Sequence, residues 1–288
     1  MTGEQAAPRP AALSIGGSRP PVWWLVLKRE LAELWVGGRA VRLLILFSVL
    51  MSITAYLLAN NTELSLTPTS VTIVTILEAA LTFGLFIGLV IGAESITGER
   101  ERATLEPLLL TPANRREIVV GKYLASLSPW PVAFLLSIPY TTLLSQGDPA
   151  LPSALFWGAI VGTMVAATFT AIGLLASIWS GSNRTSLFVS LLVYFIALLP
   201  AQLPGEFAAT AAGAFVQAVV PLEAARQFIH QLIVDGHPLG EVARLLVSSV
   251  VALVVMVGLT LGYAGPRLAL EGGVVTDIGR ARRVEVQK

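Results

Sequence analysis

Cysteine is absent from this sequence of 288 residues, and charged residues make up only 13% of it. Without cysteine the chain can form no disulfide, no thiolate metal site and no cysteine nucleophile. Soluble domains carry about 25% charged residues, so the chain is too poor in charge for that class. The hydrolase and zinc-protease signatures G-x-S-x-G and H-E-x-x-H are also missing. These absences argue against a soluble protein, against an enzyme and against a bound metal.

Six long apolar runs account for the low charge. A helix needs about 17–25 residues to cross a bilayer, and each run is long enough. The runs are Leu43–Ala59, Val71–Ala93, Tyr123–Leu144, Ala154–Ile178, Ser186–Leu203 and Leu245–Ala264. Only the second contains a charged side chain, Glu78, and none has the polar face of a water-exposed helix. We therefore expect an all-α integral membrane protein with six transmembrane helices in a membrane domain at 39–264.

Lysine and arginine indicate how these helices are oriented. With six spans, all of the 19 Lys and Arg residues except Arg226 and Arg244 fall on one side. Because loops on the cytoplasmic side are rich in these residues, we expect both termini in the cytoplasm, at the inner membrane of a prokaryote. Residues 1–19 lack the apolar core of a signal peptide and predict a flexible cytoplasmic tail. Residues 265–288 would form a second cytoplasmic tail.

Two further segments are apolar without being spans. Phe207–Val220 is too short to cross a bilayer, and Pro221 separates it from Leu222–Val234. We expect these two segments to form a re-entrant helical hairpin on the outer side, within residues 205–240. Residues 20–38 instead predict an amphipathic interfacial helix. Its apolar side would carry Trp23, Trp24, Leu27, Leu31, Leu34 and Trp35, and its polar side Arg29, Glu30 and Glu33.

Residues 94–122 concentrate charge between two apolar runs. Their alternating signs at 99–102 predict a solvated helical extension of the second span. Thr104 can cap a short helix, and Thr111-Pro112 a second one that starts at Ala113 and continues into the third span. Leu105, Leu108, Leu109 and Leu110 would form an apolar knob ringed by charges. Such a knob is typical of a docking surface for another protein.

The sequence ERERATLEPLLLTPANRREIVVGK in this segment resembles the signature loop of ATP-binding-cassette transporter permeases of the type-2 exporter class. The resemblance extends to the layout from about Pro20 to Ala264. Two residues depart from the pattern: Ala103 stands where the family usually has glycine, and Pro107 is unexpected. The resemblance implies that Glu99 to Glu117 forms a coupling helix held in a cleft of a separate ATPase subunit. It also implies a smaller contact around Asn183 and Arg184.

The expected coupling residues are Glu99, Arg100, Glu101, Arg102, Thr104, Leu105, Glu106, Leu108, Leu109, Thr111, Pro112, Arg115, Arg116, Glu117, Asn183 and Arg184. No phosphate loop is present, because Arg116 stands where the loop of Gly121-Lys122 would need its first glycine. ATP and magnesium would therefore be bound by the partner ATPase and no cofactor by this chain. Two ATPase copies and two permease copies, as a homodimer, are implied.

Several features inside the spans bear on packing and function. Glycines at four-residue spacing (Gly84, Gly88 and Gly92; Gly158 and Gly162; Gly258 and Gly262) predict close helix packing, within one subunit rather than at a dimer seam. Pro129, Pro131 and Pro139 should kink the third span. Glu78 is either an intramembrane functional residue, with Arg226 as a possible partner, or an interfacial one.

Two functions remain open at this point. The chain is either the permease of an exporter for a lipidic, amphipathic or small-molecule substrate, or a mechanotransmitting subunit. In the second case it would deliver the ATPase's work to an extracytoplasmic partner protein, as in metalloenzyme maturation, without moving a substrate. Spans almost free of charge favour an apolar substrate or none.

Overall fold

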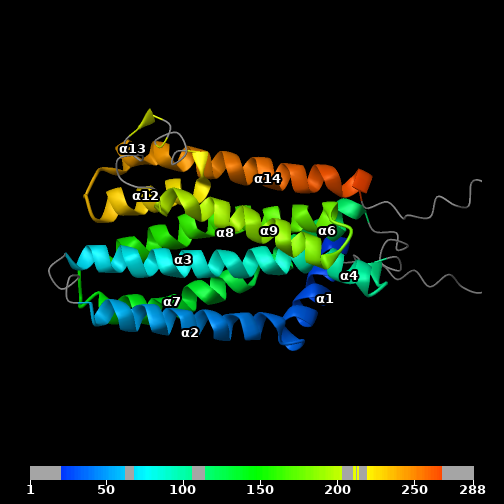
Figure 1. Cartoon of the computed structure of the whole chain (residues 1–288), viewed down its shortest axis with the longest axis horizontal. Coiled ribbons are helices and arrows are strands. Elements are labelled where there is room, and N and C mark those ends of the chain that lie inside the picture. Colours follow the sequence, from blue (N-terminus) through cyan, green and yellow to red (C-terminus); the bar gives the residue numbers. More distant parts are fainter. Residues whose placement is uncertain are drawn as a thin grey trace, which may run out of the picture.

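The computed structural model describes residues 21–61, 68–105, 114–202, 210–211, 213 and 219–267, and over these residues it contains helices and no strand. The helices are α1 (Val22–Val36), α2 (Arg39–Ala59), α3 (Thr69–Glu94), α4 (Thr97–Glu101), α6 (Arg115–Leu127), α7 (Pro129–Leu144), α8 (Leu151–Trp179), α9 (Asn183–Leu198), α12 (Pro221–Ile233), α13 (Leu239–Val242) and α14 (Leu246–Arg267). Figure 1 shows a bundle elongated along the helix axes, with α1 and α4 at one end and α12 and α13 at the other. We call these the α1 end and the α12 end.

Six helical segments in the described residues are long and apolar enough to cross a membrane. They are Arg39–Ala59, Thr69–Glu101, Arg115–Leu144, Leu151–Trp179, Asn183–Gln202 and Leu239–Ala264. The six predicted spans are thus confirmed, each extended at one or both ends. In the third span, where kinks were expected at three prolines, the helix breaks at Ser128, so that α6 ends and Pro129 opens α7, whereas Pro139 lies inside α7.

The core of the bundle lies between α3 and α8, whose glycines allow close contact. A Cβ on Gly92 would lie 2.7 Å from the carbonyl oxygen of Thr170, and one on Gly173 2.3 Å from that of Leu89. Gly84 and Gly162 both face the ring of Trp130. The expected packing within one subunit is therefore found for the second and fourth spans. Around Gly258 and Gly262 the structure leaves open space instead.

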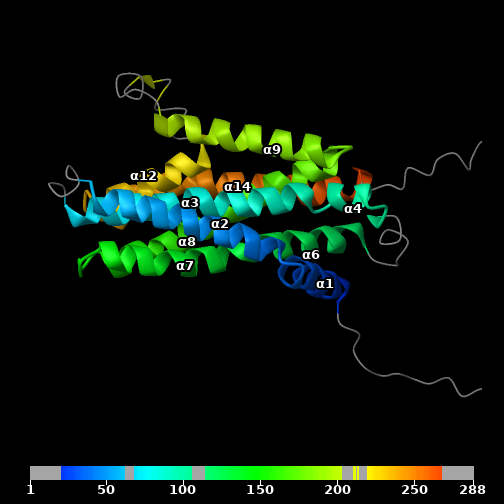
Figure 2. The same ribbon diagram turned by 60° about the horizontal axis from the view of Figure 1, so that its bottom comes forward.

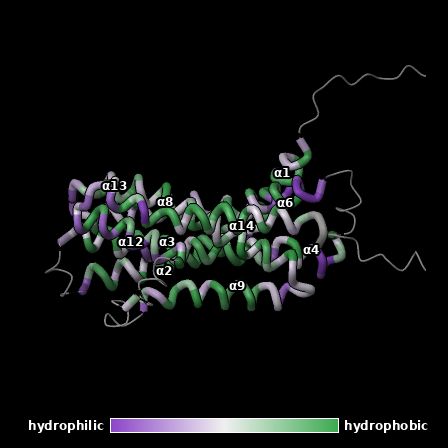
Figure 3. Tube along the Cα trace, turned by 90° about the horizontal axis from the view of Figure 1, so that it is seen from above, coloured by the Kyte–Doolittle hydropathy of each residue, from purple (hydrophilic) through white to green (hydrophobic). Residues whose placement is uncertain are grey.

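The helices around this core present apolar side chains outwards. Ile45 on α2, Phe188 on α9 and Val254 on α14 are each at least 60% exposed. Figure 3 shows the hydrophobic stretch along the middle of the bundle and hydrophilic residues at both ends. Large apolar side chains in such numbers suit contact with lipid rather than with water. Hydropathy along the whole bundle thus agrees with a multi-pass membrane protein.

The predicted outer hairpin is described only in its second part. Helix α12 begins at Pro221, as expected, and packs against α14, α8 and α3. Most of Phe207–Val220, the predicted first limb, lies outside the described residues, as do the predicted tail at 1–19 and residues 268–288 of the second one. Helix α14 continues to Arg267, three residues into that second tail. Figure 2 shows α12 and α14 side by side and α1 crossing the α1 end beside α6.

Candidate functional site

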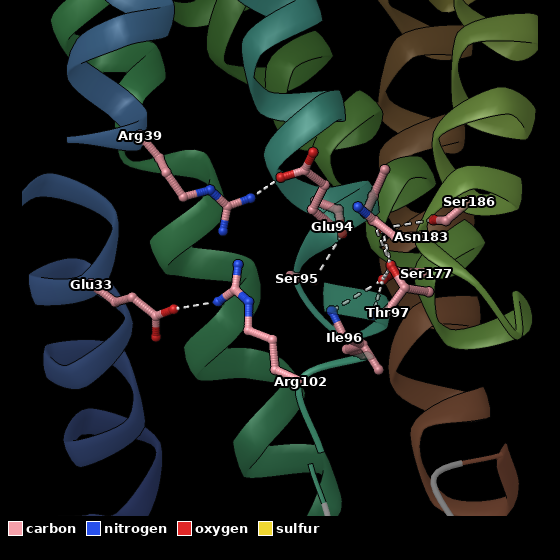
Figure 4. Close-up of polar contacts among 12 residues, drawn as sticks. Glu33, Arg39, Glu94, Ser95, Ile96, Thr97, Arg102, Ser177, Asn183 and Ser186 are labelled. Atoms are coloured by element: carbon pink, nitrogen blue, oxygen red, sulfur yellow. Dashed lines mark hydrogen bonds and ion pairs between the residues drawn. The ribbon is translucent and has the colours of Figure 1, made fainter. Parts of the chain in front are cut away.

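The charged segment that follows α3 is attached to α8 by a hydrogen-bonded bend. Between α3 and α4 the backbone amides of Ile96 and Thr97 both donate to the hydroxyl of Ser177 on α8, at 3.1 and 3.0 Å (Figure 4). Thr97, Ile96 and Ser177 are all fully or almost fully buried. The bend therefore holds α4 in a fixed position relative to α3 and α8.

The two segments expected to contact an ATPase lie next to each other. The backbone amide of Asn183, at the start of α9, donates to Glu101 Oε1 at 2.7 Å, and Arg100 donates to the carbonyl oxygen of Ser180. The Asn183 Oδ1 also lies 3.0 Å from the Thr97 hydroxyl. Glu101, Arg102 and Arg184 are exposed at this end. The structure thus gathers these predicted residues on one surface at the α1 end.

A buried lysine connects three helices beneath this surface. Lys122 on α6 is 1% exposed, and its Nζ donates to Glu30 Oε1 of α1 at 2.8 Å and to the carbonyl oxygen of Ser95 at 3.0 Å. It also lies 3.0 Å from Glu99 Oε2. Glu99 is only 5% exposed, so the expectation of a solvated stretch is wrong for this residue. The positive charge of Lys122 offsets part of the cost of removing these two carboxylates from water.

Helix α1 is held to the bundle by both of its faces. Its Val26 lies so close to Gly121 on α6 that a Cβ there would approach within 2.8 Å. Its acidic residues point towards the bundle: Glu33 pairs with Arg102 at 3.0 Å (Figure 4), and Glu30 with Lys122. The predicted polar face therefore contacts α4 and α6 rather than solvent alone. Arg39 at the start of α2 similarly pairs with Glu94 at the end of α3.

Two local predictions in this segment are wrong. Helix α6 begins at Arg115, not at Ala113, because Asn114 caps it in a reciprocal box with Glu117. Leu105 is 8% exposed and packs against the cluster of Ile96, Val119, Leu174 and Ile178, so it is not part of an exposed knob. The remaining predicted knob residues, Leu108, Leu109 and Leu110, lie outside the described residues, as do Glu106, Thr111 and Pro112.

Ala103 has a backbone conformation that explains the family's usual glycine at this position. Its φ is +57°, in the left-handed region. A residue with a Cβ costs roughly 1–2 kcal/mol there, whereas glycine adopts it freely. Thr104 follows with its backbone amide donating to the carbonyl oxygen of Glu99 at 3.0 Å, which closes the turn after α4.

Near the α12 end, a second polar cluster surrounds Glu78. Arg226 on α12 donates to the hydroxyl of Thr82 on α3 at 2.7 Å, and the Tyr194 hydroxyl of α9 donates to the carbonyl oxygen of Thr82 at 2.8 Å. Arg226 also lies 3.9 Å from Glu223. The same Thr82 hydroxyl donates to the backbone carbonyl oxygen of Glu78 at 2.8 Å. The structure thus places Glu78 one helical turn from the residue that binds Arg226.

The histidines lie at the same end in simple pairs. His230 is 3.5 Å from Asp235, and His237 is 3.5 Å from Glu241. Within the part of the chain that the structure describes, no group of three or more His, Asp or Glu side chains could hold a metal ion.

Sequence reasoning missed the residues that organise the α1 end. Lys122 was considered only as a basic residue of the charged segment and in the Gly121-Lys122 pair, and Glu30 only as part of the polar side of the interfacial helix. Thr97 and Ser177 were not singled out. Each of these acts through a partner distant in sequence: Lys122 and Glu30 are 92 positions apart. The capping box was visible locally as Asn114-x-x-Glu117, and this spacing could have located the start of α6.

Comparison with known proteins agrees with this geometry. The family described as ABC-2 family transporter protein matches residues 24–264, which include every described helix except parts of α1 and α14. No curated protein matches the chain. Because the family match covers most of the chain, and the six spans and the charged segment after α3 lie within it, this protein is a membrane protein of the ABC-2 transporter family.

Proposed function

We propose that the chain is the membrane-spanning permease subunit of an ATP-binding-cassette exporter. Membership of the family implies a partnering ABC ATPase subunit. In the proposal, ATP hydrolysis by that separate subunit drives export of a lipidic, amphipathic or small-molecule substrate. The ATPase would bind ATP and magnesium, and this chain no cofactor. Two copies of each subunit would assemble, with the permease as a homodimer.

The observation that carries the proposal is the attachment of the charged segment to α3. Glu101, Arg102 and Arg184 form an exposed surface. Thr97 and Glu99, a few residues before Glu101, are buried in contacts to α8 and α6. A protein docked on the exposed residues would therefore displace α3, α6 and α8 together. This is the property that a coupling site requires, since small shifts at a packed interface are passed on rather than absorbed.

The proposed orientation places the α1 end in the cytoplasm of a prokaryote, at the inner membrane. That end carries Arg39, Arg100, Arg102, Arg115, Arg116 and Arg184, whereas Arg226 and Arg244 lie towards the α12 end. The excess of basic residues on one side supports this orientation by the positive-inside rule.

A groove at mid-bundle supports an apolar or amphipathic substrate. It has a volume of about 270 Å³ and lies between α2, α3 and α9. Its walls are Leu43, Leu46, Phe47, Leu50, Phe83, Phe86, Ile87 and Tyr194, so the tyrosine hydroxyl is their single polar side-chain group. Hydrophilic ions would find no charged side chain on these walls.

The experiment that tests the proposal is purification of the tagged chain in a mild detergent, with its partners identified by mass spectrometry. We expect an ABC ATPase with the wild-type chain. Leu108→Asp should lose the ATPase while the chain remains in the membrane, because an apolar interface leaves a buried carboxylate without a partner. The matched control is Ser153→Asp, an exposed position at the other end of the bundle, which should retain the ATPase. Retention by Leu108→Asp would place the docking surface elsewhere, and no ATPase with the wild-type chain would contradict the proposal.

A second candidate function, transmission of force to an extracytoplasmic partner protein, is favoured by the polar cluster at Glu78. Helix α3 runs from the coupling segment to Thr82, where Arg226 of α12 is hydrogen bonded. Motion of α3 would thereby reach α12 at the far end of the bundle. A link of this kind suits a subunit whose work is delivered outside the membrane.

Reconstitution with the ATPase in liposomes separates the two functions. ATP-dependent redistribution of a fluorescent phospholipid or an amphipathic dye would support the permease. ATP turnover without such movement, accompanied by altered labelling of a cysteine at the exposed position Leu239 of α13, would support force transmission. In the second case Arg226→Gln should abolish the change in labelling but not the turnover.

A further inference from the structure

A groove between α12 and α14 lies apart from the candidate site and from the proposed substrate groove. Its volume is about 780 Å³, within the range of roughly 300–1,000 Å³ that is typical of ligand sites. It is lined by Val219, Ala224, Gln227, Arg244, Leu245, Val247, Ser248, Val251, Ala252 and Val255. In Figure 1 these two helices lie side by side at the α12 end.

The side chains that line the groove change from apolar to polar towards its outer end. Val247, Val251 and Val255 repeat every four residues on one face of α14 and are each about half exposed. Their spacing covers eight residues, or about 12 Å at 1.5 Å per residue. Arg244 lies almost one turn further out, so the whole wall is about 16 Å long, close to half of a hydrocarbon core of roughly 30 Å. The length of the groove along α14 therefore matches the thickness of one leaflet.

Polar groups lie at the outer part of this wall. Arg244 is exposed, and within the described residues no carboxylate forms an ion pair with it. The acidic residue three positions earlier, Glu241, lies 3.5 Å from His237 instead. Ser248, four residues after Arg244, and Gln227 of α12 also line the groove and add a hydroxyl and an amide to its walls. The Gln227 amide also donates to Glu223 at 3.4 Å. An anion at the water interface would match this arrangement.

The floor of the groove is held together independently of any occupant. The Ser249 hydroxyl on α14 donates to the carbonyl oxygen of Pro221 at 2.9 Å, where α12 begins. Ala224, which lines the groove from α12, is 1% exposed. The groove is thus part of the folded contact between the two helices.

From these features we propose that the groove binds one anionic phospholipid of the leaflet at the α12 end. One of its two acyl chains lies along Val247, Val251 and Val255, and its phosphate contacts Arg244. A phospholipid is the occupant that combines an apolar chain of one leaflet's depth with an anion at the interface. This inference does not depend on the proposed function or on which end of the bundle faces the cytoplasm.

The test is native mass spectrometry of the purified chain with phosphatidylglycerol, and with phosphatidylcholine as the comparison lipid. The wild-type chain should retain one phosphatidylglycerol per chain in preference to phosphatidylcholine. Arg244→Gln should weaken phosphatidylglycerol binding about tenfold and remove the preference, since a hydrogen bond to a charged group is lost. Arg244→Lys, which keeps the charge, should retain most of it. Val251→Trp, which fills the groove, should lose the lipid.

Two matched controls separate this site from the general lipid annulus. Val254→Trp adds the same side chain on α14 outside the groove, and Arg184→Gln removes an exposed arginine at the α1 end. Both should bind phosphatidylglycerol as the wild type does. Equal binding by all variants, or a wild-type chain without preference, would overturn the proposal. Loss of self-association in Val251→Trp with unchanged lipid binding would also overturn it and assign the groove to a second copy.

Discussion

At the scale of single residues, Lys122 is the point at which α1, α6 and the α3–α4 bend are joined. Its Nζ contacts Glu30, Glu99 and the carbonyl oxygen of Ser95 while the side chain is almost inaccessible to water. A buried pair of this kind does not necessarily stabilise a fold relative to apolar residues, but removal of one partner is costly. The three contacts fix the register between helices distant in sequence.

Replacement of Lys122 by methionine should therefore destabilise the protein by about 3–5 kcal/mol. The partly buried Glu30 would lose its cation, and the buried Glu99 would keep only the distant Arg29, at 4.0 Å. Thermal unfolding in detergent, together with proteolysis at the basic residues of α1, measures this effect. Lys28→Met is the control, since Lys28 is exposed and a surface substitution changes stability by about 0.5 kcal/mol or less. Addition of Glu30→Gln and Glu99→Gln to Lys122→Met should restore part of the loss. Equal unfolding temperatures for the Lys122 and Lys28 variants would show that the cluster carries no stability.

Ala103 permits a second prediction at this scale. Ala103→Gly should leave stability unchanged or raise it by up to about 1 kcal/mol, because the positive φ disappears as a source of strain while the unfolded chain gains freedom. Ala32→Gly, at an exposed position inside α1, should instead cost about 1 kcal/mol. The pair is compared by thermal unfolding in the same detergent, and a loss of similar size in both variants would contradict the prediction.

At the scale of elements, the contact between α3 and α8 depends on the backbones approaching each other. Gly173→Ala should destabilise the protein by about 1–3 kcal/mol, since its Cβ would meet the carbonyl oxygen of Leu89 and neither backbone can move freely. Gly262→Ala on α14 is the matched control, as the described residues leave open space around it. In that helix interior alanine should be neutral or stabilising. Unfolding temperatures that fall equally in both variants would show that backbone proximity is not the cause.

The elements differ in how far the sequence predicted them. Hydropathy located all six spans because length and apolarity are properties of each segment alone. The glycine spacing likewise predicted the packing of α3 and α8. The burial of Leu105 could not be predicted in this way, because it depends on residues of α6 and α8 that only the fold places beside it.

The candidate site was predicted in outline but not in its interior. The charge pattern at 99–102 identified the segment, and the resemblance supplied the second contact at Asn183 and Arg184. Glu99 was expected in solvent, yet it is buried because Lys122 provides a cation inside the bundle. The ion-pair partners of charged residues lie on other helices, so no local sequence pattern distinguishes the buried Glu99 from the exposed Glu101.

At the scale of the whole molecule, the two ends of the bundle should face opposite sides of the membrane. Ser153 is exposed in the first turn of α8, and Thr185 is exposed in the first turn of α9, which begins shortly after α8 ends. Helix α8 is 29 residues long, or about 44 Å at 1.5 Å per residue, so the two positions lie at opposite ends of the bundle. Because the chain contains no cysteine, a single introduced cysteine reports its own position. In intact cells an impermeant maleimide should label Ser153→Cys and not Thr185→Cys, whereas both should react after permeabilisation. Labelling of Thr185→Cys alone would reverse the proposed orientation.

Burial is unequal across the molecule. In their most apolar stretches, α3 and α8 have 61% of residues buried, against 17% in α2 and 11% in α14. The central pair is therefore fixed by protein contacts, while the outer helices depend largely on surrounding lipid. If a second copy binds, we expect the lipid-facing helices α2 and α14 to shift more easily than the central pair α3 and α8.

The charge pairs that hold α1 also differ in their access to dissolved ions. The side chains of Arg102 and Glu33 are 54% and 42% exposed, whereas those of Lys122 and Glu30 are 1% and 15% exposed. At 1 M salt the screening length falls to about 3 Å, which weakens the first pair far more than the second. Rising ionic strength should thus weaken the Glu33–Arg102 pair first, while the Lys122–Glu30 pair, the buried Leu34 and the Trp35–Ser128 hydrogen bond keep α1 in place. Salt then removes one surface contact of this helix and leaves the fold intact.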